Sequence, residues 1–196
     1  QEKVWAALPD WARERPDRIR DALTEKHIAA DSNLALFVGI KAYEDAGGAV
    51  LREFQALAQR AEDAGYAGLV VTESGRTAYL SCAAAAVGGT TLDLCTGVAV
   101  AFPRSPMVTA AIAWELAEAT EGRFRLGIGT QVRAHIERRY SSEFDPPGPR
   151  LREYVLALKA IFAAYRGGKL AFEGKYYNLS LLPAMWSPGA IDVPDP

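Results

Sequence analysis

The residues of this sequence that could do chemistry stand directly after apolar runs. Glu73 and Ser74 follow the run 68–72, and Arg104 follows the run 94–100 after a short loop. A carboxylate in that position can bind a hydroxyl group or a polar ring edge, whereas a serine cannot serve unaided as a base near neutral pH. We interpret Glu73 and Ser74 as candidate catalytic residues and Arg104 as a candidate binding residue. The alternative for Glu73 is a carboxylate at a solvated strand end.

A second polar group lies in the segment 130–149, which is long for a loop inside a compact domain and therefore functional or mobile. Its part 134–140 is compatible with a short helix. Guanidinium groups match phosphate oxygens as planar forks, so the cluster could meet a phosphate or an anionic substrate. The alternative is a solvated helix face. The cluster consists of Arg133, His135, Arg138 and Arg139.

The stretch 92–129 predicts the local architecture around these residues. It reads as an apolar strand at 94–100, a helix that begins at Pro106, and a second strand at 124–129. This βαβ unit implies parallel strands and a right-handed crossover. Ser105 can cap the helix, and both strands carry glycine in their later halves, which allows another backbone or a ligand to come close. The spacing predicts one apolar helix face, made of Val108, Ala111, Ile112, Leu116 and Ala119.

The same alternation runs through most of the chain. Strands that begin near residues 34, 68, 93 and 123 make four strand–helix units, which favour a parallel α/β architecture. In such proteins the ends of the strands are where chemistry is done. An open doubly wound sheet and a barrel both fit this pattern. The further elements that we predict are strands at 34–40 and 68–72, helices at 49–64, 79–87 and 151–165, and a hairpin at 170–179.

Composition excludes several classes of function. The 196 residues are 49% hydrophobic and 23% charged, with a formal net charge of −2, which predicts a globular core and gives no electrostatic case for a nucleic acid partner. No apolar run approaches the ~20 residues that span a bilayer, and the charged N-terminus lacks a signal-peptide core, so we expect a cytoplasmic protein without membrane association. Cys82 and Cys95, like His27 and His135, lack ligand spacing, so we expect no metal site.

Four segments resemble the bacterial-luciferase-like flavin and deazaflavin oxidoreductases, in particular the coenzyme F420-dependent group. They occur in the family's order and at compatible spacing. The resemblance implies a TIM-type (β/α)8 barrel of which this chain holds about four βα units, a half-barrel fragment in residues 34–196. Residues 1–33 match nothing in the family and form a leader of uncertain structure, with either a docked charged helix at 16–30 or a loosely packed segment. The matching segments are 64–74, 96–106, 122–130 and 172–177.

The resemblance also implies a cofactor site at the strand ends. Gly97-Val98 falls where family members carry a non-proline cis peptide that supports the cofactor ring from behind; the alternative is a glycine that only relieves crowding. Thr130 and Gln131 would donate hydrogen bonds to the cofactor. Related sugar-phosphate dehydrogenases carry an acid–histidine pair where this chain has Glu73-Ser74, and some relatives carry an acid where it has Val132. Both departures remove a candidate proton carrier. The resulting cofactor-binding candidates are Gly97, Val98, Arg104, Thr130, Gln131 and His135.

The function that this resemblance implies is hydride transfer between coenzyme F420 and a small organic substrate. The first alternative is an FMN-dependent monooxygenase on the same fold. The strand at 124–129 would be an uncovered apolar edge of a half-barrel, which favours a fragment of a longer protein or completion by a partner chain. The second alternative is therefore an inactive half-barrel that only associates, and we expect a homo-oligomer. A small open-sheet binding domain, its edge covered by residues 1–33, is a third.

Overall fold

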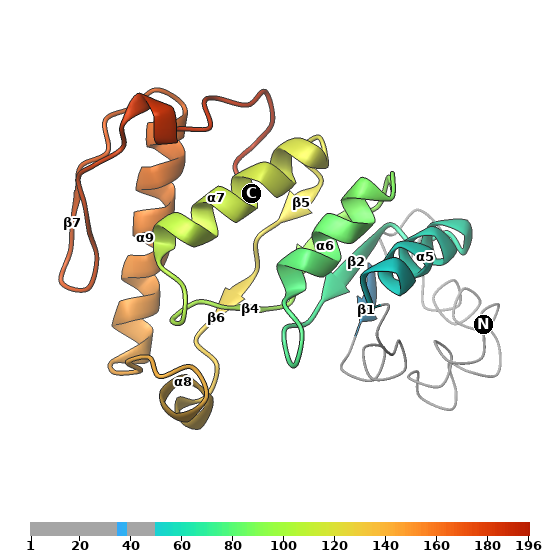
Figure 1. Ribbon diagram of the computed structural model, residues 1–196, viewed down its shortest axis with the longest axis horizontal. Coiled ribbons are helices and arrows are strands. Elements are labelled where there is room, and N and C mark those ends of the chain that lie inside the picture. Colours follow the sequence, from blue (N-terminus) through green and yellow to red (C-terminus); the bar gives the residue numbers. More distant parts are fainter. Residues whose placement is uncertain (1–34, 39–49) are drawn as a thin grey trace, which may run out of the picture.

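The computed structural model describes residues 35–38 and 50–196. The predicted leader 1–33, with its helix at 16–30, lies outside these residues. Helices α5, α6 and α7 lie in a row across one face of the strands, and α9 stands beside α7 (Figure 1). No helix in these two segments is long and apolar enough to cross a membrane. The elements are β1 (Ala35–Val38), α5 (Val50–Asp63), β2 (Gly68–Val71), α6 (Ala78–Val87), β3 (Asp93–Thr96), β4 (Ala99–Val100), α7 (Pro106–Ala119), β5 (Phe124–Arg125), β6 (Ile128–Gly129), α8 (Arg133–Arg138), α9 (Pro147–Tyr165), β7 (Phe172–Glu173), β8 (Asn178–Leu179) and a 3-10 turn, η2 (Ala184–Trp186).

The main sheet is parallel, as the alternation of strands and helices predicts. Its order is β1-β2-β3-β5, and a second parallel pair, β4-β6, continues beyond it. Because all these strands run in one direction, their carboxyl ends share one edge. The loops that carry the candidate residues therefore leave the sheet at the same end.

The two strands predicted at 94–100 and 124–129 are each divided in two, which corrects the expectation of continuous strands. The Gly97–Val98 peptide bond is cis, as the family resemblance implies. The hydroxyl of Thr96 donates to the carbonyl oxygen of Gly127 at 2.7 Å and accepts from the amide of Gly127 at 2.9 Å. A side chain thus replaces the ladder at the point where β3 and β5 give way to β4 and β6.

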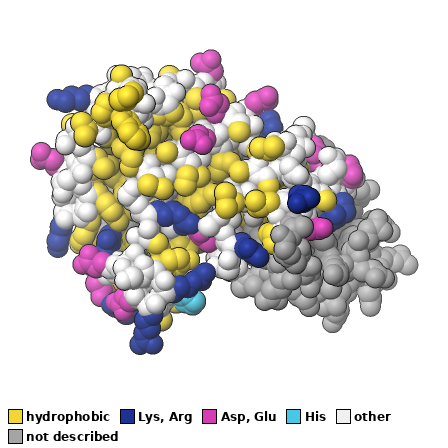
Figure 2. Space-filling model, in the orientation of Figure 1, with side chains coloured by type: hydrophobic (Ala, Val, Ile, Leu, Met, Phe, Trp, Pro, Cys, Tyr) yellow, Lys and Arg dark blue, Asp and Glu magenta, His cyan; other side chains and the backbone are white. Residues whose placement is uncertain are grey.

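Helix α7 begins as predicted, with the hydroxyl of Ser105 accepting from the amide of Val108 at 3.2 Å. The predicted apolar face is wrong at Val108, which is 51% exposed, and at Ala119, which is also exposed. Leu116 is buried as predicted, and Ile112 is partly buried against the core. The helix is apolar on almost every side, so periodicity could not single out the buried face. Figure 2 shows hydrophobic side chains spread over the face formed by α6, α7 and α9. The side chains that α7 buries are Pro106, Thr109, Ala110, Ala113, Trp114, Leu116 and Ala117.

The contact between α7 and α9 is aromatic. Trp114 stacks on Phe162 with 5.6 Å between ring centroids and meets Tyr165 edge-on at 5.3 Å. The hydroxyl of Tyr154 lies 2.5 Å from that of buried Thr109. This packing explains why a threonine lies inside α7, because its hydroxyl is satisfied there. Helix α5, by contrast, buries the five side chains that its spacing predicts, namely Val50, Phe54, Leu57, Ala58 and Ala61.

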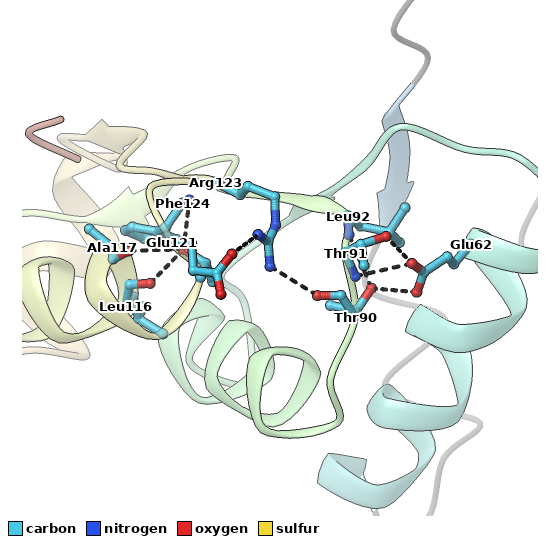
Figure 3. A network of polar contacts seen from close by, with 10 residues as sticks. Glu62, Thr90, Thr91, Leu92, Leu116, Ala117, Glu121, Arg123 and Phe124 are labelled. Atoms are coloured by element: carbon cyan, nitrogen blue, oxygen red, sulfur yellow. Dashed lines mark hydrogen bonds and ion pairs between the residues drawn. The ribbon is translucent and has the colours of Figure 1, made fainter. Parts of the chain in front are cut away.

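A polar network fixes the opposite end of the sheet, where the chain enters β3 and β5 (Figure 3). Glu62, near the end of α5, accepts from the hydroxyl of Thr90 and from the amide of Thr91, both at 3.1 Å. Arg123 donates to the carbonyl oxygen of Thr90 at 3.3 Å. The hydrogen bond from the Thr91 hydroxyl is the main cause that holds the pKa of Glu62 below its usual value. This network serves the packing of helices on strands and lies away from the candidate site.

Candidate functional site

Val98 stands out from an otherwise buried strand segment at the carboxyl end of the sheet. Its side chain is 48% exposed, whereas Ala99 and Val100 are buried. Gly129 lies beneath it, and a Cβ atom at position 129 would come within 2.9 Å of the Val98 side chain. Only glycine therefore leaves Val98 in this position. We call Val98 and the Gly129 backbone the ledge.

Glu73 lies just beyond β2 and is buried, with 9% of its surface exposed. One carboxylate oxygen accepts from the amide of Val100 at 2.7 Å and from Arg104 at 2.9 Å. The other accepts from the second guanidinium nitrogen of Arg104 at 2.5 Å, which makes a two-pronged ion pair. The carboxylate is thus held between two elements, and its catalytic role stays a prediction.

Arg104 lies in the loop between β4 and α7. It donates to the carbonyl oxygen of Val100 at 2.8 Å as well as to Glu73, and it covers the ring of Tyr79 at 5.1 Å. Burial opposes the charged form of its guanidinium, but the hydrogen bonds and the charge of Glu73 outweigh burial and raise the pKa of Arg104. Burial likewise raises the pKa of Tyr79 to about 12, so this phenol stays neutral. The fork of Arg104 is therefore engaged within the protein.

Ser74 connects the end of β2 to the excursion after β6. Its carbonyl oxygen accepts from Arg139 at 2.7 Å, across 65 positions of sequence. Its hydroxyl makes no hydrogen bond with any residue in the described segments.

Thr130 and Gln131 form the turn that follows β6. Gln131 has a left-handed backbone, with φ +60. The Thr130 hydroxyl donates to the carbonyl oxygen of Gln131 at 3.0 Å, and the Gln131 side-chain oxygen accepts from the amide of Val132 at 2.9 Å. Both side chains thus stabilise their own turn, and the side-chain NH2 group of Gln131 donates to no residue within the described segments.

Helix α8 carries the basic cluster. His135 is exposed, whereas its neighbour Ile136 is buried and fixes the helix on the protein. Arg133 pairs with Asp145 and Glu137, and its guanidinium covers the ring of Phe144 at 4.8 Å. The carboxylates hold the pKa of Arg133 above its usual range. Arg133 and Arg139 thus have partners in the protein, whereas His135 and Arg138 form no ion pair with any residue in the described part of the chain.

Two contacts of this site escaped sequence reasoning. The Glu73–Arg104 pair joins residues 31 positions apart, and neither hydrophobic periodicity nor local spacing predicts such a pair. The second is the pair of hydrogen bonds between the Thr96 hydroxyl and the backbone of Gly127. The sequence offers one local indication of it, a hydroxyl-bearing residue directly before Gly97. No cluster of three or more metal-ligating side chains gathers in the part of the chain that the structure describes.

In the described residues, one groove borders Tyr79 and Arg104 of this site, and a second lies beside β5 and β6. One, of about 430 Å³, lies between α6 and α7 and is lined mainly by apolar side chains such as Leu80 and Ile112. The other, of about 540 Å³, lies beside β5, β6 and α9 and is lined by Leu126, Ile128 and Phe162 among others. Val98 lines neither of these two grooves, and its exposed side chain lies at the end of β3.

Comparison with known proteins agrees with this architecture. Residues 32–196 match the model of a family described as luciferase-like monooxygenase. Over 133 residues, which make up 67% of this chain, the sequence is 40% identical to uncharacterized proteins of Mycobacterium bovis and Mycobacterium tuberculosis. The match spans 39% of the length of these curated relatives.

Solved structures share the fold at low sequence identity. The FMN complex of the oxygenating constituent of 3,6-diketocamphane monooxygenase from Pseudomonas putida has a TM-score of 0.60 at 17% identity, over 82% of this chain and 50% of that one. A monooxygenase from Streptomyces bottropensis has 0.61 at 22% identity, over 82% and 51%. The coenzyme F420 dependent tetrahydromethanopterin reductase from Methanopyrus kandleri has 0.55 at 21% identity, over 74% and 43%. The fold is therefore a partial TIM-type barrel that covers about half of such chains, as predicted.

Proposed function

This chain belongs to the luciferase-like monooxygenase family, and we propose that it supplies the cofactor-supporting half of a deazaflavin- or flavin-dependent oxidoreductase. The reaction that we propose is hydride transfer between coenzyme F420 and a small organic molecule. The observation that carries the proposal is the ledge, an exposed apolar side chain at the shared carboxyl edge of parallel strands. FMN-dependent monooxygenation is the second candidate, since one structural relative is described in complex with FMN.

The residues at the ledge fit a planar ring. Such a ring needs a flat apolar support and polar groups at its edge. Val98 offers the apolar surface, and Gly129 brings no side chain that would lift Val98 out of place. The bound cofactor would supply the hydride or oxygen chemistry, which no side chain of the chain can perform.

The neighbouring loops would provide the polar contacts. Gln131 and Ser74 lie in loops at the same end of the sheet. We assign the side-chain NH2 group of Gln131 to the edge of the cofactor ring and the hydroxyl of Ser74 to the substrate. A serine hydroxyl can donate a hydrogen bond there but cannot take up a proton unaided. His135, exposed on α8, is our candidate contact for an anionic part of the cofactor or substrate.

Titration of the purified 196-residue chain with FMN, and separately with F420, tests the proposal. We expect one of the two fluorescence signals to change saturably, and the tighter ligand to identify the cofactor. Val98→Asp should weaken this binding at least about tenfold, since it places a charge under an apolar ring. Val108→Asp is the matched control, because Val108 is equally exposed but lies on α7.

A chain that binds neither cofactor and yet associates with itself would favour the inactive half-barrel. Equal effects of the two aspartate variants would contradict the assignment of the ledge. Binding that is lost in Val98→Asp alone would support it.

A further inference from the structure

Val100 is held by two side chains at both of its backbone polar groups. Its amide donates to the carboxylate of Glu73 at 2.7 Å, and its carbonyl oxygen accepts from Arg104 at 2.8 Å. The same guanidinium also binds the same carboxylate, at 2.9 and 2.5 Å. The three residues therefore form a closed ring of hydrogen bonds, in which the position of each group depends on the other two.

This ring of hydrogen bonds lies at β4, where strand pairing supplies few backbone hydrogen bonds. β4 comprises only Ala99 and Val100 and pairs on one side with β6. On the side toward β2, Glu73 takes the place of a neighbouring strand, because its carboxylate accepts the amide of Val100. On the other side, the amide of Ala99 donates to the carbonyl oxygen of Gly127 at 2.8 Å, which also accepts from Thr96. Val98 precedes this doubly held segment by one residue.

We propose that Glu73 and Arg104 are a positioning pair, whose ion pair holds the backbone of β4 and thereby sets the height and direction of the Val98 side chain at the ledge. The inference deepens the proposed function, on which its cofactor part rests. Hydrogen bonds to charged groups are stronger than neutral ones, so the pair suits a segment that must not move under a ligand.

The contacts argue against two simpler roles for these residues. A general base must be accessible to substrate, whereas the Glu73 side chain is 3% exposed and is held by Arg104 and the amide of Val100. An arginine that binds phosphate needs an unpaired guanidinium group, whereas the guanidinium of Arg104 forms an ion pair with Glu73. Both side chains are largely buried, with 3% of Glu73 and 19% of Arg104 exposed.

Amide hydrogen exchange of the cofactor-free chain tests the pair without any ligand. In Glu73→Gln the side chain keeps an oxygen but loses the ion pair, and in Arg104→Lys the charge stays but the fork is lost. We expect the Val100 amide to exchange about 10- to 100-fold faster in Glu73→Gln, which is the loss of one charged hydrogen bond. Arg104→Lys, the milder variant, should give a smaller increase, and the methyl signals of Val98 should shift or broaden in both.

Glu153→Gln is the matched control. Glu153 also anchors backbone, since its carboxylate accepts from the amides of Lys175, Tyr176 and Tyr177 in the distant hairpin. This variant should loosen those amides and leave Val98 and Val100 unchanged. The double variant Glu73→Gln/Arg104→Lys should differ little from Glu73→Gln alone, because coupled partners are not additive.

Cofactor titration then separates positioning from stability. We expect Glu73→Gln to weaken binding of the cofactor at least about tenfold, and Glu153→Gln to leave it unchanged even at equal loss of global stability. Unchanged Val98 signals, or faster exchange of Val100 with unaltered cofactor affinity, would overturn the positioning role. Failure of the parent chain to bind FMN or F420 would refute the proposed function, and the Val98 signals alone would then decide whether the pair sets the ledge.

Discussion

Two side chains, Thr96 and Glu73, form hydrogen bonds with backbone groups where the main sheet divides. The Thr96 hydroxyl binds both polar groups of Gly127, and Glu73 binds the amide of Val100. Buried backbone groups that lose their strand partner must find another one, because leaving them without a hydrogen bond costs about 1–3 kcal/mol each. These two residues therefore satisfy backbone groups that the split leaves without a strand partner. The split directs Val98 outward while its neighbours stay buried.

At the other end of the strands, the lowered pKa of Glu62 leads us to expect that the free energy of unfolding depends on pH. Its pKa is lowered in the folded chain from an ordinary value of 4.5, mainly by the hydrogen bond from Thr91. The carboxylate therefore stabilises the fold at pH values above about 4.5, and this contribution is lost as the pH falls through the lower folded value. We expect Glu62→Gln to unfold more easily in urea than the parent at pH 7, and the difference to shrink toward pH 3.

The exposed Glu137 supplies the control for this measurement, because its partner Arg133 is itself half exposed. Glu137→Gln should change stability at pH 7 by less than about 0.5 kcal/mol. A difference between Glu62→Gln and the parent that stays constant from pH 7 to pH 3 would contradict the role of its ionisation.

Among the elements, α7 and α9 are joined by a buried aromatic cluster around Trp114. The indole is fully buried between Phe162 and Tyr165, and its N–H donates to the carbonyl oxygen of Gly189 at 3.0 Å. The cluster thus ties the C-terminal segment to the two helices as well. Since α7 begins two residues after Arg104, its placement also fixes the loop that carries this arginine.

We expect replacement of Trp114 to cause a large loss of stability. Trp114→Ala should reduce the free energy of unfolding by about 3–5 kcal/mol, the range for removing a buried aromatic side chain. Trp186 is the matched control, since it is 74% exposed, and Trp186→Ala should change stability by no more than about 0.5 kcal/mol. Urea unfolding followed by circular dichroism measures both. Equal losses in the two variants would show that the cluster does not join the helices.

At the scale of the whole molecule, the described part of the barrel has an open side. β5 has one neighbouring strand, β3, and β6 has one, β4, in the segments that the structure describes. The groove beside them is lined by apolar side chains from the strands and from α9. Parallel strands are normally covered on both sides, so an edge of this kind favours pairing with further chain.

We therefore expect the isolated 196-residue chain to self-associate through this edge. Leu126→Lys places a charge in the groove and should shift sedimentation toward the monomer. Leu181→Lys, at a leucine that is 76% exposed in a loop, should leave association unchanged. A parent chain that stays monomeric at every concentration would contradict the expectation, and so would equal behaviour of the two variants.

The sequence by itself determined the order of the main helices and parallel strands in the described segments, although not the division of the strands at 94–100 and 124–129. Apolar spacing placed α5 and its five buried residues, and the hydroxyl of Ser105 with Pro106 marked the start of α7. Both signals are local, because helix periodicity and capping depend on residues only a few positions apart. The alternation of units then gave the parallel sheet, and the family resemblance gave the partial barrel and the cis bond at Gly97-Val98.

Only the tertiary structure decided how the site is held. The buried face of α7 depended on aromatic partners in α9, and the roles of Glu73 and Arg104 depended on their pairing across the end of the sheet. Sequence spacing predicts neither the buried face of α7 nor this ion pair. The carboxylate and the guanidinium come within hydrogen-bond distance only when the strands and loops that carry them have folded. The sequence thus located Val98, Glu73 and Arg104, and the fold determined that Val98 is exposed while the other two bind each other and the backbone of Val100.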